Sequence, residues 1–267
     1  MKTIYCVFVL GLCLFFFSCK KNSIVKDTGS DNKELKEGLI AYYPFNGNAI
    51  DESGNGNNLN VIGATLDENR FGDPQKAYKF NGTSSDYMVI PGILGADSLR
   101  ELSISVWAKV GGSGHTSILS FLAGENDICS SYLGFDNSND NFSIWHQMVE
   151  VATPFNCTAI VLRKKIDNPL ETWNHLVFVQ KYDATVMPGR YTYISYYNGK
   201  KVDSQMTAYD MNTIATSFSK GGVIGANNNS GNYSLNFDYF NGCIDEIRIY
   251  NRALSDNEVS QLYLLKE

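Results

Sequence analysis

The stretch from Asp51 to Asn57 places an oxygen-bearing side chain at every second position. Asp51, Ser53 and Asn55 alternate along the chain, Gly56 follows, and Asn57 continues the alternation. Oxygen ligands at this spacing open many calcium-binding loops, because calcium takes about six to eight hard oxygen ligands. The stretch therefore predicts a structural calcium site. The alternative is a loop of Asx turns that binds no ion.

The loop does not have the pattern of an EF-hand. The twelfth position of that motif carries a bidentate Glu, and counting from Asp51 this position is Ile62. No helical pattern flanks the loop on either side. Backbone carbonyls, Asn57 and water would therefore have to complete the coordination of a calcium ion.

A second group of chemistry-bearing residues lies between residues 132 and 147, where aromatic and polar side chains are mixed. An aromatic ring stacks on the C–H face of a sugar, while amide and carboxylate groups bond its hydroxyls. Tyr132 and Trp145 are the candidate platforms for such stacking. The other candidate ligand-binding residues are Asn139, Asp140, His146 and Gln147. The segment predicts a carbohydrate-binding surface, the alternative being that Trp145 belongs to the core.

Residues 1–18 have the form of a targeting segment. Lys2 supplies the positive end, an apolar run from Ile4 to Phe17 follows, and Cys19 then precedes two lysines. A small residue before this Cys resembles a bacterial lipobox, which implies cleavage before Cys19 and lipidation of its thiol and amine. The alternative is an ordinary secretory signal with an accidental Cys. Several lipid chains anchor a protein firmly, so we expect a lipoprotein of the bacterial cell envelope, at the outer membrane.

The rest of the chain divides into a tether and one domain. Residues 19–37 are polar and charged and are typical of a flexible tether, whereas residues 38–267 are long enough to bury one sizeable core. The net charge of the chain is −6. This argues against nucleic acid as a partner, because nucleic-acid binding needs a basic face.

Cysteine use fits an oxidising envelope compartment. Without the targeting segment and the lipidated Cys19, the chain retains Cys129, Cys157 and Cys243. An odd number allows at most one disulfide within the chain. Cys129 and Cys157 lie in polar, loop-like surroundings and are the favoured pair, whereas Cys243 lies among apolar strand residues and is expected to be buried.

From Gly38 onward, short β-rich runs alternate with Asn-Gly and Gly-Gly turns, and Asn-Gly favours tight hairpins. Several runs place apolar residues at every second position, as a sheet with one buried face requires. The predicted strands are Leu39–Phe45, Ala77–Phe80, Tyr87–Ile90, Leu102–Val110, Ser117–Ala123, Tyr132–Asp136, Phe142–Met148, Ala159–Lys164, Trp173–Lys181, Tyr191–Tyr197, Lys200–Gln205, Gly222–Ile224 and Gly242–Tyr250.

Helical signals are scarce. The convincing one begins at Ser255, which with Glu258 forms a capping box that predicts a helix of about two turns. Many short strands followed by one late helix predict an all-β fold, a two-sheet antiparallel sandwich.

The order of motifs from Gly38 resembles laminin-G-like domains of the concanavalin A-like lectin/glucanase superfamily. The motifs that carry the resemblance are Gly38–Gly56, Lys79–Gly82, Ser103–Lys109, Trp173–Phe178, Tyr197–Lys200, Ile224–Ala226 and Phe240–Ser255. The resemblance implies a jelly roll in which the first and last strands are neighbours. It also implies that Asp245, on the last strand, adds a second carboxylate to the calcium loop.

Glucanases of this fold use acidic residues at alternate positions of one strand, a spacing that suits retaining hydrolysis. The sequence contains no such run, and the adjacent Asp245 and Glu246 would point to opposite faces of a regular strand. His115 is interpreted as a loop residue and His175 as a structural strand histidine. We therefore expect a non-catalytic carbohydrate-binding or adhesion module. The alternatives are a glycoside hydrolase with divergent carboxylates and a structural, protein-binding subunit of an envelope complex.

Overall fold

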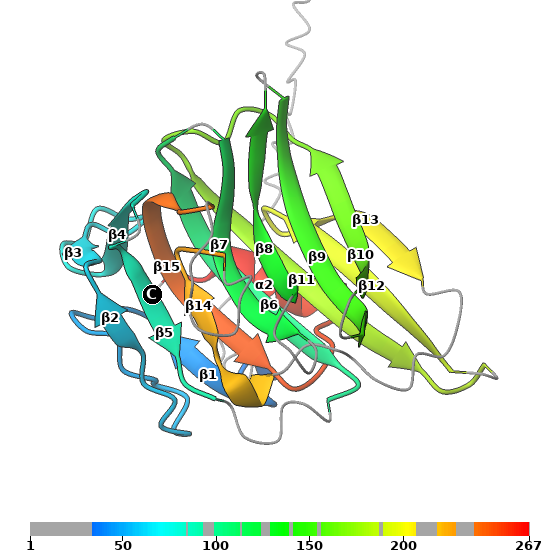
Figure 1. Ribbon diagram of the computed structural model, residues 1–267. Coiled ribbons are helices and arrows are strands. Elements are labelled where there is room, and N and C mark those ends of the chain that lie inside the picture. The colour runs from blue at the N-terminus through cyan, green and yellow to red at the C-terminus, as the bar shows by residue number, and fades with distance from the viewer. Residues whose placement is uncertain are drawn as a thin grey trace, which may run out of the picture.

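The computed structural model describes residues 34–83, 85–92, 99–112, 114–123, 129–138, 141–153, 156–186, 189–206, 218–227 and 238–266. These residues form two antiparallel β-sheets, packed face to face, and a short α-helix (Figure 1). Within the same residues, no helix has the length and apolar character needed to cross a membrane.

Sheet A contains eight strands. Their order is β13 (Lys200–Met206), β12 (Arg190–Tyr197), β11 (Trp173–Asp183), β6 (Leu102–Val110), β15 (Asn241–Tyr250), β4 (Ala77–Asn81) and β3 (Thr65–Asp67), and β1 (Leu39–Tyr43) also pairs with β15. Sheet B contains seven strands. Their order is β10 (Asn156–Lys165), β9 (Asn141–Thr153), β8 (Cys129–Ser138), β7 (Gly114–Ala123), β14 (Gly222–Ile224), β5 (Tyr87–Ile90) and β2 (Asn60–Ile62). A 3-10 turn, η2 (Phe218–Lys220), precedes β14, and helix α2 (Asp256–Leu264) follows β15.

The predicted jelly-roll sandwich is confirmed, and every predicted strand is present. Strands β5, β6 and β14 begin and end where the sequence predicts. The sequence prediction missed β2 and β3, because each has only three residues and shows no alternation to detect. The predicted contact between the ends of the chain is also confirmed, since Tyr43 of β1 is the register partner of Ile247 of β15.

The core lies between the two sheets. On β6, Ile104 and Val106 point toward sheet B, and on β8, Leu133 and Phe135 point back toward sheet A. All four side chains are buried in the same cluster, which is what period-two alternation produces when one face of each sheet is shielded from water.

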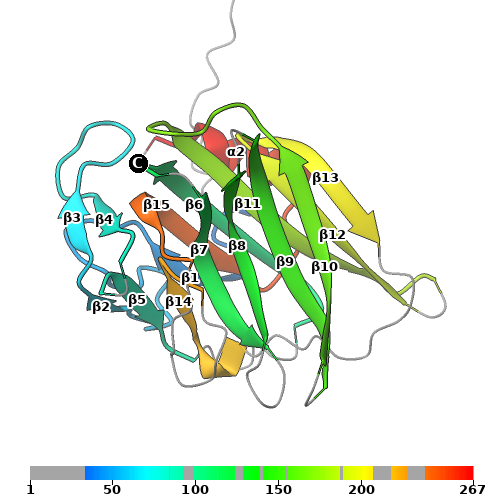
Figure 2. The same ribbon diagram turned by 45° about the horizontal axis from the view of Figure 1, so that its top comes forward.

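The outer face of sheet A is covered by α2. Ser255 and Glu258 form the predicted capping box at its start. Val259 and Leu262 of the helix are buried in one cluster with Val177 of β11, on the side of sheet A that faces away from sheet B (Figures 1 and 2).

Residues 34–37 belong to the domain, although the sequence assigns them to the tether. Leu35 is buried in the cluster under α2. The guanidinium of Arg252 donates hydrogen bonds of 2.9 and 2.8 Å to the carbonyls of Glu34 and Glu37. One apolar residue in a polar segment gave too little signal to place this boundary from the sequence.

Strand β15 contains a β-bulge between Asp245 and Arg248, where Glu246 adopts a positive φ of 53°. The prediction that Asp245 and Glu246 point to opposite faces is therefore wrong, because it assumed a regular strand. Arg70 Nη1 lies 3.2 Å from Asp245 Oδ2 and 3.9 Å from Glu246 Oε1. Glu246 also forms an ion pair with Arg248, and all four side chains are almost completely buried.

We expect Glu246→Ala to lower the free energy of unfolding by about 3–5 kcal/mol, because it leaves a buried arginine without its carboxylate. Urea unfolding followed by circular dichroism would measure the change. Glu68→Ala, at an exposed position, is the matched control and should change the stability by less than about 0.5 kcal/mol. Equal stability of the two variants would contradict a structural role for the buried pairs.

Candidate functional site

The face of sheet B that points away from sheet A carries three rows of side chains across β7, β8, β9 and β10. Each row joins register partners on neighbouring strands. The first row is His115, Asp136, Ser143 and Lys165, the second is Ser117, Gly134, Trp145 and Arg163, and the third is Ser120, Tyr132, Gln147 and Val161. We call this face the β7–β10 face, and Figure 2 shows its four strands at the front of the molecule.

Three aromatic side chains meet on this face. The rings of Tyr132 and Trp145 are nearly parallel, at 20°, with centroids 6.3 Å apart. The ring of His115 stands perpendicular to both, with its centroid 5.0 Å from that of Trp145 and 5.7 Å from that of Tyr132. All three rings are partly exposed, so they form a surface and not part of the core. Such a surface can stack on the apolar face of a ligand.

Gly134 allows β7 and β8 to approach closely beside these rings. It lies in the middle row between Ser117 and Trp145, and His115 reaches across its strand to contact Trp145. A Cβ at residue 134 would stand only 2.0 Å from the backbone oxygen of Thr116. The absence of a side chain here therefore allows the close approach of β7 and β8 at the β-bulge between Ser117 and Leu119.

Two cation–carboxylate pairs border the aromatic rings. The guanidinium of Arg163 lies 5.0 Å from the ring centroid of Trp145, forms an ion pair with Asp136 and donates a 3.1 Å hydrogen bond from Nε to the hydroxyl of Ser143. On the other side, His115 Nδ1 lies 3.2 Å from Asp238 Oδ2. The rings are thus surrounded by paired charges that leave the local charge close to balanced.

The electrostatic environment keeps the hydroxyl of Tyr132 protonated. Burial, and then the negative charges of Asp238 and Asp136, raise the pKa of Tyr132. The hydroxyl therefore remains a hydrogen-bond donor at neutral pH. Nearby, the indole Nε1 of Trp145 is a buried donor with no hydrogen-bond partner among the residues that the structure describes.

The structure brings together three of the six ligand-binding residues that the sequence predicts. Tyr132, Trp145 and Gln147 share the β7–β10 face. His146 points the other way, into the space between the sheets, where Nδ1 lies 2.6 Å from the hydroxyl of Ser195. Asn139 and Asp140 lie outside the described residues.

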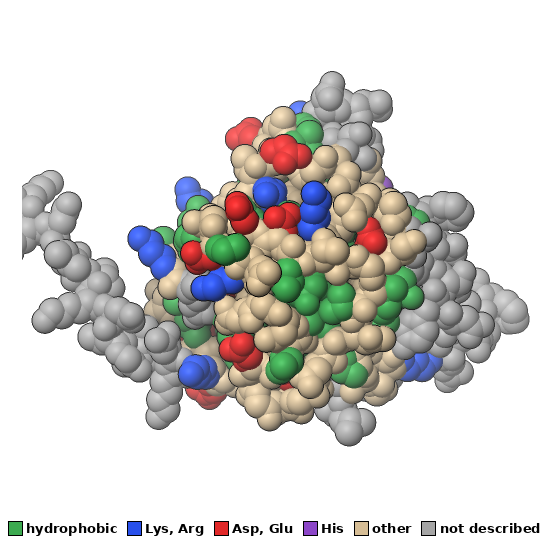
Figure 3. Space-filling view, turned by 90° about the vertical axis from the view of Figure 1, so that its left-hand side faces the viewer, with side chains coloured by type: hydrophobic (Ala, Val, Ile, Leu, Met, Phe, Trp, Pro, Cys, Tyr) green, Lys and Arg blue, Asp and Glu red, His purple; other side chains and the backbone are tan. Residues whose placement is uncertain are grey.

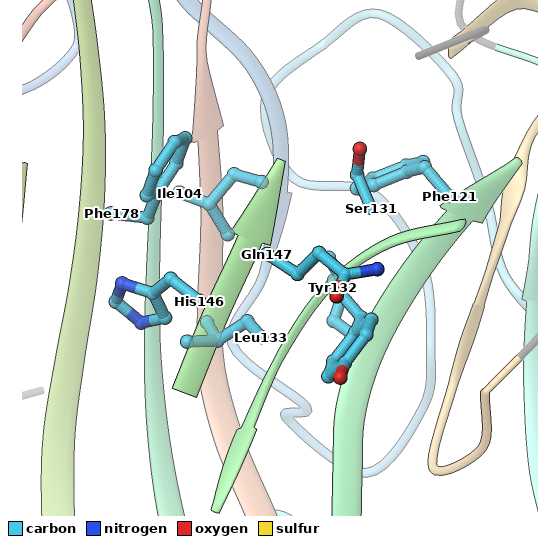
Figure 4. A pocket seen from close by; sticks show the side chains of 9 residues that line it. Ile104, Phe121, Ser131, Tyr132, Leu133, His146, Gln147 and Phe178 are labelled. Carbon is cyan, nitrogen blue, oxygen red and sulfur yellow. The ribbon is translucent and has the colours of Figure 1, made fainter. Parts of the chain in front are cut away.

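A small pocket lies beneath this face, between the two sheets. Figure 4 shows Tyr132 and Gln147 on one side of it and His146 and Phe178 on the other. Its cavity volume is about 20 Å³. This is room for about one or two water molecules and not for a sugar ring, so a carbohydrate would have to bind on the exposed face.

The sequence analysis missed His115, Gly134 and Arg163 as members of this site. Gly134 is the register partner of Trp145 in the β8–β9 pair and Arg163 is its partner in the β9–β10 pair, so both residues join the site only through strand register. His115 was interpreted as a loop residue because it follows a glycine-rich segment, whereas it is the second residue of β7.

The loop predicted to bind calcium is organised by hydrogen bonds to Asp51. Its Oδ1 accepts from the backbone N–H groups of Tyr42 and Ser53, both at 2.9 Å, and its Oδ2 accepts from that of Asn57 at 2.9 Å. Ser53, Asn55 and Asn57 all donate from their side chains to the carbonyl of Ile40. Asp51, Ser53, Asn55 and Asn57 therefore lie together as the sequence predicts.

Asp245, which the resemblance assigns to this loop, is instead paired with Arg70, as described above. Within the described residues, no group of three or more His, Cys, Asp or Glu side chains is placed to hold a metal ion. Because three backbone N–H groups point at Asp51, an ion there would have to share or replace these contacts. The calcium site stays a prediction.

The cysteines divide between the two sheets. Cys129 and Cys157 lie in β8 and β10, the two strands that flank β9. Their side chains are outside the described part of the chain, so the disulfide between them stays a prediction. Cys243 is a free, buried thiol in β15, as the sequence predicts.

Charge on the side of the molecule that carries β2 to β5 is mixed. Figure 3 shows acidic and basic side chains interspersed there, with a group of hydrophobic side chains among them. The visible surface has no continuous basic stripe of the kind that nucleic-acid binding needs.

A family model described as the concanavalin A-like lectin/glucanases superfamily matches residues 81–260. A search of curated proteins finds no match. The family match includes all four strands of the β7–β10 face and therefore also His115, Tyr132 and Trp145.

Solved structures with the same fold include two kinds of binding domain. Domain 4 of AbnA, a GH43 extracellular arabinanase from Geobacillus stearothermophilus solved in complex with arabinotriose, is 22% identical with a TM-score of 0.57, and the match covers 84% of this chain and 98% of that domain. The binding domain of botulinum neurotoxin DC, in complex with rat synaptotagmin II, is 14% identical with a TM-score of 0.61, and the match covers 86% of this chain and 52% of that one. This chain thus spans about half the length of the toxin domain. At these identities the likeness shows the fold alone.

We expect Gly134→Ala to destabilise the protein by about 1–3 kcal/mol, because the added methyl group collides with the backbone of β7. It should also change the near-ultraviolet circular dichroism of the ring cluster, since β7 and β8 must move apart. Gly47→Ala is a control for backbone strain alone, because Gly47 has a φ of +76° while an added Cβ there meets nothing within 4 Å, and it should leave the near-ultraviolet spectrum of the rings unchanged. A Gly134→Ala spectrum identical to that of the wild type would contradict the packing described for the rings.

We expect Asp51→Ala to cost about 2–4 kcal/mol, because three backbone donors lose a charged acceptor. Burial by itself would raise the pKa of Asp51, but the hydrogen bonds from Tyr42, Ser53 and Asn57 lower it overall. The stabilisation is therefore full above the unfolded-state pKa of about 3.9 and is lost as the pH falls through the lower folded-state value.

Thermal unfolding at neutral and acidic pH would measure both effects, with exposed Glu52→Ala as the control. The gap between wild type and Asp51→Ala should narrow in acid, and a constant gap would contradict the assignment. A rise in Tm on adding calcium to the wild type, absent from Asp51→Ala, would support the calcium site.

Proposed function

The chain belongs to the concanavalin A-like lectin/glucanases superfamily, and from this premise we propose that it is a non-catalytic carbohydrate-binding module that binds glycan on its β7–β10 face. The single observation that carries the proposal is the cluster of three partly exposed rings on this face, bordered by polar and charged side chains. Sugar recognition combines these two elements, because pyranose and furanose rings have apolar C–H faces and hydroxyl edges.

The two outer faces of the sandwich support this choice of surface. On sheet A, helix α2 packs over Val177 and Val179, and these side chains are fully buried. On sheet B, Tyr132, Trp145 and Gln147 remain partly exposed. Ser117 and Ser120 of β7 are buried beneath residues 226 and 238, so an oligosaccharide would lie on the exposed side chains of β8 to β10 and on His115.

The carboxylates of this face favour binding over catalysis. Asp136 forms an ion pair with Arg163, and Asp238 lies beside His115. Each of these carboxylates is thus engaged by a basic side chain, which leaves it less available as the nucleophile of a glycosidase. The other adjacent pair, Asp245 and Glu246, is buried under Arg70 and does not reach the surface.

Domain 4 of the arabinanase was solved with arabinotriose, which makes arabinotriose the first ligand to test here. The neurotoxin domain was solved with a protein partner, and a protein ligand is accordingly the second candidate function. The two are distinguished by whether the isolated domain binds purified oligosaccharide.

We also propose that Cys19 carries lipid and anchors the module to the bacterial cell envelope, at the outer membrane. The apolar run before Cys19 and the polar residues after it support this. Labelling with a radioactive fatty acid followed by membrane fractionation tests it. Label and membrane location should both be lost in Cys19→Ala, and a wild-type protein without label would overturn the proposal.

We expect Trp145→Ala to weaken glycan binding by at least about tenfold, because it removes the larger aromatic platform. A glycan array that includes arabinotriose, followed by calorimetry on each ligand found, would measure the loss. Trp173→Ala is the matched control, because Trp173 lies in β11 of the opposite sheet beside Lys109. Equal loss in the two variants, or no binding to any glycan by the wild type, would contradict the proposal.

A further inference from the structure

His115 lies on β7, at one edge of the β7–β10 face, and contacts both aromatic platforms. Its ring is perpendicular to Trp145 at 79° and to Tyr132 at 73°. A cation within about 6 Å of an aromatic centroid is attracted to the ring, and both centroids lie within this distance of the imidazole. The charge of His115 therefore contributes directly to the contacts that hold the three rings together.

Asp238 fixes His115 from the other side. His115 Nδ1 lies 3.2 Å from Asp238 Oδ2, and Asn227 Nδ2 donates a 3.3 Å hydrogen bond to the same oxygen. The backbone N–H of Ser117 donates to the carbonyl of Asp238 at 3.2 Å, which ties this residue to β7. The carboxylate is thus held in place from two directions and aims at the imidazole.

The charged groups that face His115 come from three elements. Asp238 precedes β15, Asp136 is its register partner on β8, and Arg163 lies across the rings on β10. The close Asp238 carboxylate raises the pKa of His115 most, burial opposes this, the charge of Asp136 raises it further, and Arg163 lowers it. The result is a pKa above the usual value.

The chain contains three histidines, and the other two do not titrate near neutral pH. His146 and His175 are buried between or against the sheets, and burial lowers the pKa of each to about 3. A change in the protein near neutral pH that depends on histidine can therefore be assigned to His115.

We propose that His115 is a positioning residue that couples its protonation to the arrangement of the Tyr132–Trp145 ring pair, and that glycan affinity on the β7–β10 face consequently depends on pH. The second half of this proposal rests on the proposed function, whereas the coupling of the rings to His115 does not. Protonated His115 is attracted by the Asp238 carboxylate and by both rings, and the neutral form retains only the weaker contacts.

The sign of the effect follows from the raised pKa. The charged contacts of His115 are complete below the unfolded-state pKa of about 6.5 and are lost as the pH rises through the higher folded-state value. Ring order and glycan affinity should therefore be greatest in mildly acidic solution and decline above neutral pH.

The first test uses the protein without ligand. Tryptophan fluorescence recorded from about pH 5 to about pH 9 should show a single transition, because a protonated imidazole quenches a neighbouring indole and a neutral one does so less. The transition should be absent from His115→Gln and from Trp145→Phe, and present in Trp173→Phe. A wild-type protein without the transition, or a transition that persists in His115→Gln, would overturn the proposal.

A second variant tests the proposal even if His115→Gln fails to fold. Asp238→Asn keeps the histidine but removes the main cause of its raised pKa, so the midpoint of the transition should move to lower pH. If His115 had only a structural role, the midpoint of the fluorescence transition would not move. An unchanged midpoint in a folded Asp238→Asn protein would count against the proposal.

The affinity test uses arabinotriose, or the tightest ligand of the glycan array, measured by calorimetry at about pH 6 and about pH 8.5. The Kd of the wild type should rise by about fivefold or more between these values, and that of His115→Gln should stay constant. Binding without pH dependence and without the fluorescence transition would refute the coupling but leave the proposed function standing. A transition without any glycan binding would refute the function but leave the ring coupling standing.

Discussion

The fold depends on strand β15, which lies near the C-terminal end of the domain and pairs with β1 at the N-terminal end. β6 pairs with β15 along most of its length, β4 pairs with its first half and β1 with its second half. The β-bulge at Glu246 separates the two halves and turns two adjacent carboxylates toward Arg70. Arg70 also lies over the ring of Trp107 and donates to the carbonyl of Leu265. Breaking buried ion pairs of this kind is costly. Through Arg70, the bulge therefore holds both the loop around residue 70 and Leu265, near the C-terminus, against sheet A.

This arrangement gives the two sheets different roles. In sheet A the first and last strands of the domain pair with each other. The outer face of this sheet is occupied by α2, by residues 34–38 and by the buried charges. Sheet B contributes one face to the same core, and among the residues that the structure describes no α-helix covers its other face. A side chain on the β7–β10 face can therefore serve recognition without loss of core packing, while neighbours such as His146 and Phe135 point inward and hold the strands in place. Because side chains alternate along each strand, those on the outer face are available for recognition, whereas those on the inner face stabilise the core.

The sequence predicts the fold well because the fold depends on local patterns. Alternation identifies β6 at both ends, and the capping box at Ser255 identifies α2. It predicts the candidate site only in part, since a site on a sheet depends on register across strands. Tyr132, Trp145 and Gln147 follow from their types, whereas Gly134 and Arg163 join them only through pairing. The face of Glu246 could not be predicted, because a bulge with positive φ at a glutamate has no reliable sequence signal.

A shared sandwich fold does not determine the ligand. The side chains of its outer faces are free to vary, whereas those of its inner faces are constrained by packing. The AbnA domain solved with arabinotriose and the toxin domain solved with synaptotagmin differ in ligand but not in architecture. In this chain, two basic side chains near the rings each lie beside a carboxylate, Arg163 beside Asp136 and His115 beside Asp238. A strongly charged partner would meet as much repulsion as attraction on such a surface. A ligand rich in hydroxyls can donate to the carboxylates, accept from the basic groups and stack on the rings at once, which is why this surface suits the carbohydrate ligand that we propose.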